Sequence, residues 1–434
     1  MKSLLPSLCV LFVTLSSASS AFAISETQYH DVYETQVIPW AKQAPVWTFN
    51  GKDGIKIAYV CYHKPGANDV IVVSSGRTES IPKYFELAYD IFHSELQTSI
   101  CLMDHRGQGL SQRLISDPRK GHVNHFDHYA DDLATMVKKT QSFGYTNTYI
   151  WSHSMGGAAA VRMDQNYPNL ISGLILTAPM LGVNTSPYPN AVAHTLAGNM
   201  VLFFMGEDFI PGKTYYEPTG DDDAFNDNHV TRSKARWLMA ENQFLLHNDE
   251  WPQAPLGGGT AKWLLEAIEG TWKIDYNAAS LSAPTLLLQA GKEAYVKPES
   301  QTTVCQKAQN CQIYSFEQDQ YRDRDGELPR HELLMETDDV RDEVLLRGFE
   351  FLKDLGVPTV PASDGGVGDS VELTHRTDPL DPADSGNNWL LKDRDFLGGG
   401  GCSGLPGAGP KAEWFFPGMV FLGSWWRRRR LPVS

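Results

Sequence analysis

Short apolar runs alternate with amphipathic segments over most of the chain. The runs are rich in branched aliphatic and aromatic residues and predict buried strands at 46–49, 55–62, 69–73, 98–104, 147–152, 172–179, 284–290 and 312–316. Segments with helical periodicity lie between them, at 84–96, 129–142 and 157–167. Strands that alternate with helices predict an α/β protein with a mostly parallel central sheet, covered by helices on both faces.

One interval interrupts this alternation. Residues 183–281 contain no clear buried strand, but they include helical stretches at 192–205, 231–246 and 261–268. A helical insertion of this length between two strands of a sheet predicts a lid. The predicted core therefore has a first part, 24–182, and a second part, 282–357. Its last helix, 338–355, is stopped by Gly356 and Pro358.

The two ends of the chain differ in composition from this core. Residues 1–23 begin with Met1 and Lys2, continue with an apolar run and end in small residues at Ala23, which is typical of a secretory signal peptide. The apolar run is too short to span a membrane. Residues 358–434 start with a long stretch rich in Gly, Pro, Asp and Ser, which predicts a flexible tail.

The overall composition narrows the classes of function. The chain has 434 residues, 42% of them hydrophobic, so it can bury a large core. Its formal net charge of -15 argues against nucleic acid as a partner. In an exported chain Cys305 and Cys311 could close a small loop. Cys61 and Cys101 either face one another across neighbouring strands or stay buried thiols.

The strongest chemical signal surrounds Ser154, in the sequence Ser-His-Ser-Met-Gly-Gly at 152–157. It follows a predicted strand and opens a predicted helix. A serine on such a tight turn exposes its hydroxyl, and the helix N-terminus points at it. The usual pattern is Gly-x-Ser-x-Gly, and Ser152 is a small substitute for the first glycine. The sequence predicts Ser154 as a nucleophile.

A serine hydroxyl needs a base, and in this architecture an acid and a histidine follow the nucleophile along the chain. Glu293 is the carboxylate directly after the strand at 284–290, and we expect it to orient the histidine, with Glu299 as the alternative. His331 lies in a loop between the last predicted strand and the C-terminal helix. It is the predicted base.

Attack on a carbonyl also creates an oxyanion, which needs preorganised N–H donors. The backbone N–H of Met155, directly after the nucleophile, is the first expected donor. The second is expected in the loop after the strand at 69–73, at Gly76 or Arg77.

Taken in order, these motifs resemble the lysophospholipase and monoacylglycerol lipase branch of the bacterial α/β-hydrolases. The resemblance covers roughly residues 30–355 and is carried by the segments 75–80, 104–111, 121–123, 152–157, 231–237 and 331–336. It implies the α/β-hydrolase fold with a helical lid. It also implies Ser154 as nucleophile, His331 as base and Glu293 as acid. Many relatives have aspartate at the acid position, so the glutamate is a departure from the pattern.

The end of the chain resembles a GlyGly-CTERM sorting tail of Gram-negative bacteria. A glycine run at 398–401 is followed by an apolar stretch at 414–426 and by arginines at 427–430. Together with the signal peptide, the resemblance implies export to the periplasm, the cell surface or the medium.

Several polar clusters are set aside as metal sites, because they match no known ligand spacing. They are His122, His125 and His128, the run Asp221, Asp222 and Asp223, and the group Asp319, Asp323 and Asp325. We expect no metal and no cofactor.

These observations predict a serine esterase that releases a fatty acid from a lysophospholipid or a monoacylglycerol. Lid residues such as Trp237 and Trp263 could contact the acyl chain, and the lid could touch a membrane surface transiently. A hydrolase of peptides or small esters would need the same catalytic groups, and a non-catalytic surface binding module of the same fold is a further alternative. The oligomeric state stays open.

Overall fold

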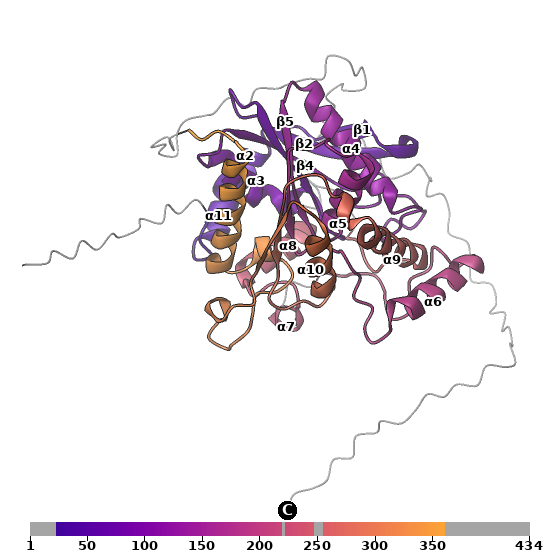
Figure 1. Ribbon diagram of the computed structural model, residues 1–434. Helices are drawn as coiled ribbons and strands as arrows, with labels where there is room; N and C mark the ends of the chain where they lie inside the picture. Colours follow the sequence, from indigo (N-terminus) through magenta and orange to yellow (C-terminus); the bar gives the residue numbers. More distant parts are fainter. Residues whose placement is uncertain (1–22, 219–221, 247–254, 361–434) are drawn as a thin grey trace, which may run out of the picture. The chain divides into compact units, whose positions relative to one another are not determined.

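The computed structural model describes residues 23–218, 222–246 and 255–360, without the side chains of 242–246. Almost all of the predicted signal peptide and of the predicted tail therefore lies outside the described residues. An eight-stranded sheet forms the centre of the protein (Figure 1). Its strands, in spatial order, are β1 (Trp47–Asn50), β2 (Lys56–Tyr62), β4 (Thr98–Met103), β3 (Asp69–Ser74), β5 (Asn147–His153), β6 (Gly173–Thr177), β7 (Thr285–Gln289) and β8 (Cys311–Ser315).

The order of the strands explains where a site can form. β2 pairs antiparallel with both β1 and β4, and all later neighbours are parallel. From β3 the chain goes outward to β4 and then returns to β5 on the other side of β3. The carboxyl ends of β3 and β5 therefore lie side by side, with Ser74 opposite Ser152. Such a switch point in a parallel sheet is the usual position of a ligand crevice.

Helices cover both faces of the sheet (Figure 1). The apolar side chains of α3 (Phe85–His93) and α11 (Asp338–Asp354) join the core on one face, and those of α4 (Asp127–Ser142), α5 (Ser154–Asn166) and α10 (Pro298–Lys307) join the core on the other. Every residue of β3 and β4 is buried, as expected for strands covered on both sides. The predicted α/β architecture is confirmed.

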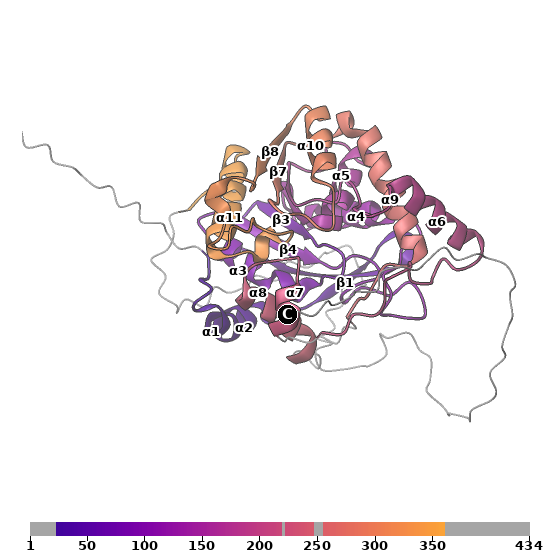
Figure 2. The same cartoon turned by 90° about the horizontal axis from the view of Figure 1, so that it is seen from below.

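In its described residues, the segment between β6 and β7 contains four α-helices. They are α6 (Asn190–Leu202), α7 (Asp222–Asp227), α8 (Lys234–Leu246) and α9 (Ala261–Tyr276), and α6 packs along α9 at one side of the sheet in both views (Figures 1 and 2). α9 runs beyond the predicted end at 268, because buried Thr271 and Ile274 continue its apolar stripe. Where the lid begins and ends stays a prediction.

The N-terminal part adds the short helices α1 (Tyr29–Val32) and α2 (Ile38–Ala41), which are joined by a π-helical turn at Tyr33–Val37. Trp40 of α2 stacks on Tyr62 of β2, with ring centroids 4.2 Å apart. The contact attaches this segment to the antiparallel edge of the sheet. No helix within the described ranges is long and apolar enough to cross a membrane.

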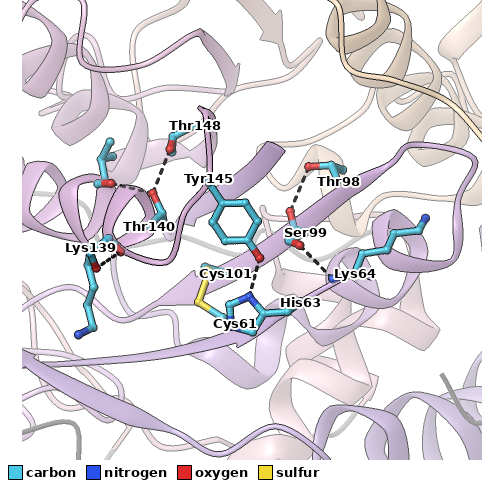
Figure 3. The surroundings of a disulfide bond; sticks show 12 residues. Cys61, His63, Lys64, Thr98, Ser99, Cys101, Lys139, Thr140, Tyr145 and Thr148 are labelled. Carbon is cyan, nitrogen blue, oxygen red and sulfur yellow. Dashed lines mark hydrogen bonds between the residues drawn. A yellow bond between two sulfur atoms is a disulfide. The ribbon is translucent and has the colours of Figure 1, made fainter. Parts of the chain in front are cut away.

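The cysteines of the described residues form two disulfides. Cys61 of β2 lies directly opposite Cys101 of β4, with Cα atoms 4.1 Å apart, and the two are bonded. Figure 3 shows this bond beside Tyr145, whose hydroxyl bonds to His63. Cys305 and Cys311 close the predicted small loop. The register of β2 against β4 thus places Cys61 opposite Cys101, so the two form a disulfide and are not separate buried thiols.

Candidate active site

Ser154 stands at the turn between β5 and α5, with a φ of 48°. A positive φ is costly for a residue with a side chain and is kept only where the surroundings enforce it. Here a side chain at Gly156 would collide with the carbonyl oxygens of Ser74 and Ser75. The glycine lets the start of α5 approach the loop after β3, and the turn presents the serine hydroxyl at the carboxyl end of the sheet.

The structure brings the predicted acid and base to this hydroxyl. His331 Nε2 lies 2.9 Å from Ser154 Oγ, and His331 Nδ1 lies 2.7 Å from Glu293 Oε2. Glu293 follows β7, and His331 lies between β8 and α11. These three residues are far apart in the sequence, but they meet because the carboxyl ends of parallel strands share one edge of the sheet.

Glu293 is held as an ionised acceptor. Its Oε1 accepts the backbone N–H groups of Ala294 and Tyr295, each at 2.9 Å. Burial works to raise the pKa of this carboxyl, but His331 and the backbone donors outweigh it and hold the pKa below its usual value. A carboxylate at Nδ1 requires the proton on that nitrogen, so Nε2 is free to accept the serine proton. Glu299, the alternative, lies instead in the first turn of α10.

The structure separates the two candidates for the second oxyanion donor. The Gly76 N–H donates to Glu79 Oε2, which commits it away from the nucleophile. The Arg77 N–H has no hydrogen-bond partner among the described residues. Met155 lies in the first turn of α5, where N–H groups lack helical partners. The geometry therefore disfavours the Gly76 prediction and leaves Met155 and Arg77 as the donor pair.

A buried group of charged residues, missed in the sequence, lies behind the site. We call Glu79, Lys83, His153 and Glu332 the buried quartet. Lys83 Nζ lies 2.6 Å from Glu79 Oε1 and 2.8 Å from Glu332 Oε1, and His153 Nε2 lies 3.3 Å from Glu332 Oε2. The His153 ring also packs on that of His331, at 4.8 Å between centroids. The quartet connects the oxyanion loop, the nucleophile turn and the histidine loop.

Electrostatics favour the charged forms of His153 and Glu332. Burial alone would lower the pKa of His153, but the carboxylates of Glu332 and Glu79 outweigh it and raise the pKa. Burial likewise opposes the charge of Glu332, yet His153 and Lys83 hold its pKa far below the usual value. The Glu79, His153 and Glu332 ligand atoms lie within 4.8 Å of one another, a spacing that a cation could use. The Lys83 ammonium provides that positive charge here.

The histidines at 122, 125 and 128 bond to separate partners. His122 bonds to Thr260 and Asn124, His125 lies near Glu266, and His128 lies near Arg106 and Asp53. Their side chains therefore do not share one centre.

The other polar groups set aside have local roles as well. Asp323 accepts the N–H groups of Asp325 and Glu327, and Asp319 pairs with Arg322. Asp222 pairs with Lys234, and Asp221 lies outside the described residues.

Trp237 and Trp263, the two lid tryptophans named as possible acyl-chain contacts, are both buried. Trp237 packs on Phe225, with ring centroids 5.5 Å apart. Trp263 lies under the Arg77 guanidinium, 5.1 Å from its carbon. Trp263 is therefore a lid residue that contacts the oxyanion loop.

A serine on a strained strand-to-helix turn, linked through histidine to a carboxylate on a mostly parallel sheet, defines a serine hydrolase of the α/β-hydrolase class. Residues 65–338 match the family described as serine aminopeptidase, S33. The chain belongs to this family of hydrolases, and the predicted fold and enzyme class are confirmed.

Individual relatives agree with this assignment. The chain is 34% identical to lysophospholipase L2 of Escherichia coli strain K12, over 59% of this chain and 73% of the relative. It is 28% identical to a probable lysophospholipase L2 of Haemophilus influenzae, over 76% of this chain and 98% of the relative. The fold resembles a solved monoglyceride lipase of Saccharomyces cerevisiae with a TM-score of 0.53 and 18% identity, covering 72% of this chain and 96% of that one.

Proposed function

We propose that this protein is an esterase that releases the fatty acid from a lysophospholipid or a monoacylglycerol through an acyl-enzyme on Ser154. The hydrogen-bonded chain Ser154–His331–Glu293 carries the proposal, because it supplies a nucleophile, a base and an orienting acid in the required order. The relatives named lysophospholipase L2 support the lipid substrate.

The geometry assigns each step of the reaction. Ser154 Oγ attacks the ester carbonyl while its proton passes to His331 Nε2, and the N–H groups of Met155 and Arg77 hold the oxyanion. The ester C–O bond then breaks as His331 returns the proton to the leaving glyceryl oxygen. Water attacks the acyl-enzyme with His331 again as base, which releases the fatty acid and restores the serine.

Product analysis tests the substrate class. The purified protein is incubated with an equimolar pool of 1-oleoyl-lysophosphatidylglycerol, 1-monooleoylglycerol and leucine p-nitroanilide, and the products are followed by mass spectrometry. We expect free oleate and the matching glycerol product. Release of p-nitroaniline without oleate would contradict the esterase proposal and favour an aminopeptidase, as the family description suggests.

The lid also presents an apolar surface suited to a lipid aggregate, and we propose that it touches the membrane transiently. At the end of α6, the side chains of Leu202, Phe203 and Phe204 are 69%, 68% and 99% exposed. Clustered exposed apolar side chains mark a contact surface, and aromatic residues suit the membrane interface.

Replacing Phe204 with serine is expected to weaken binding to phosphatidylglycerol-containing vesicles severalfold in co-sedimentation, because each buried aromatic ring contributes to partitioning. Tyr276→Ser is the matched control, since Tyr276 is 89% exposed but ends the neighbouring helix α9. Equal binding by wild type and Phe204→Ser would contradict the membrane contact.

We also propose that the chain is exported and processed. The predicted signal peptide supports this location, and so do the disulfides, because such bonds persist mainly in oxidising compartments. Intact-mass measurement of the mature protein should give a chain that begins at Ile24. A shortened C-terminus would agree with a cleaved sorting tail, and an unprocessed N-terminus would contradict export.

A further inference from the structure

The Arg77 side chain occupies an unusual position between the oxyanion loop and the lid. Its Nη1 donates to the Gly257 carbonyl at 2.8 Å, and its guanidinium lies over the Trp263 ring. Among the described residues it makes no ion pair. One hydrogen bond uses only a small part of a group that carries five N–H donors.

A partly buried guanidinium without an anion is unfavourable, because its charge has lost water and gained no counter-charge. Burial accordingly lowers the pKa of Arg77. Several other buried guanidinium groups of this protein pair with carboxylates, as Arg106 does with Asp132 and Arg341 with Asp90. Arg330 also lacks a carboxylate, but it donates to the backbone carbonyls of Asn228 and Thr231.

The position of Arg77 in the chain brings its charge close to the reacting groups. Its backbone N–H belongs to the loop that approaches the nucleophile turn, so its side chain starts beside the ester carbonyl. The titratable groups that act on its pKa are the phenols of Tyr129 and Tyr295, both uncharged at neutral pH. The Tyr295 ring in turn packs on His331, with centroids 5.2 Å apart. The guanidinium therefore lies on the lid side of the oxyanion loop.

We propose that the Arg77 side chain is a phosphate subsite, which binds the phosphodiester of a lysophospholipid while the backbone N–H of the same residue binds the oxyanion. The inference rests on the proposed function and refines it, because it makes lysophospholipid the preferred substrate over uncharged monoacylglycerol. A guanidinium suits this task, since its planar donors match phosphate oxygens in pairs.

The dimensions of the two partners agree. An extended arginine side chain places its guanidinium carbon about 6 Å from Cα, and the phosphorus of a lysophospholipid lies about 7 Å from the ester carbonyl carbon, because each path is a short chain of single bonds of ~1.5 Å. One residue can therefore reach both ends of the glycerol unit.

The test compares two lipids with the same acyl chain. The ratio of kcat/KM for 1-oleoyl-lysophosphatidylglycerol to that for 1-monooleoylglycerol is measured in wild type, Arg77→Met, Arg77→Lys and Arg119→Met. Methionine keeps an unbranched apolar stem without the charge. The ratio of the two kcat/KM values cancels any change of the oxyanion loop that affects both lipids. Arg119 is the matched control, because it already pairs with Glu217.

We expect Arg77→Met to lower this ratio about tenfold or more, because the variant loses a charge-assisted hydrogen bond to the phosphate. Arg77→Lys should give an intermediate ratio, because the charge stays but the paired donors are lost. The ratio of Arg119→Met should stay near that of wild type. An unchanged ratio in Arg77→Met, or a wild type that prefers monooleoylglycerol, would overturn the phosphate subsite.

A second measurement separates this inference from the proposed function. Hydrolysis of p-nitrophenyl butyrate needs only the catalytic groups, and sn-glycerol 3-phosphate should inhibit it competitively by occupying the subsite. The inhibition constant should rise about tenfold or more in Arg77→Met. If the wild type cleaves this small ester but neither lipid, the proposed function is wrong. Inhibition by sn-glycerol 3-phosphate then still tests whether Arg77 binds phosphate. An unaltered inhibition constant overturns the subsite in either case.

Discussion

The Ser154→Ala protein is expected to lose ester hydrolysis, with kcat/KM reduced by about 10⁴-fold or more while the protein stays folded. Without the hydroxyl no acyl-enzyme can form, and His331 and Glu293 have no nucleophile to activate. What remains is binding and oxyanion stabilisation, which act far more weakly on a water molecule. Loss of the Oγ–Nε2 hydrogen bond at a position already strained by its φ should affect stability little.

The control for this prediction is Ser152→Ala, two residues earlier in the same turn. The Ser152 hydroxyl bonds to the Ile175 carbonyl in β6 and not to the acid or the base. The family pattern accepts glycine there, so most of the activity should remain. Labelling by a fluorophosphonate probe should mark wild type and Ser152→Ala but not Ser154→Ala. Turnover retained by folded Ser154→Ala protein would refute the assignment of the nucleophile.

The second large effect is expected at Glu293. A glutamine there keeps the size of the side chain but offers an amide that can donate to His331 Nδ1. The imidazole would then carry its proton on Nε2, the nitrogen that must accept the serine proton. We expect kcat to fall by about 10³- to 10⁴-fold, the scale found when the acid of such a triad becomes an amide.

Glu299→Gln is the matched control, because Glu299 was the other candidate for the acid and lies only a few residues further on. It opens α10 and does not contact His331 in the structure. Its variant should keep nearly wild-type kcat on p-nitrophenyl butyrate. Similar losses in the two variants, or a larger loss in Glu299→Gln, would show that the acid is assigned wrongly.

Much of the fold could be predicted because buried strands and amphipathic helices leave clear periodic patterns. Each predicted strand is present, and most of the ends differ by only a residue or two. The meeting of Ser154, Glu293 and His331 followed from chain order. Ser154 and Glu293 come soon after strands, His331 lies in the loop after β8, and the carboxyl ends of these strands lie at the same edge of the sheet. These signals lie in the sequence itself and can be recognised without knowing how the elements pack.

The remainder depends on tertiary contacts that leave no pattern in the sequence. Glu79 and Lys83 are spaced like an ordinary helical ion pair, and nothing near them shows that His153 and Glu332 complete the group. The choice between Gly76 and Arg77 depends on the Glu79 carboxylate, whose position is visible only in the structure. The sequence offers one indirect hint at this buried group, because His153 directly precedes Ser154 and Glu332 directly follows His331.

The bond between Cys61 and Cys101 determines how the protein can be produced. It closes a loop with a sequence separation of 40, and closing such a loop in the unfolded chain is worth about 4 kcal/mol by chain-entropy reasoning. Whole domains have margins of only about 5–15 kcal/mol. A chain synthesised in a reducing cytosol would have the same catalytic groups but would lack a large part of that margin, so an oxidising host is the better source.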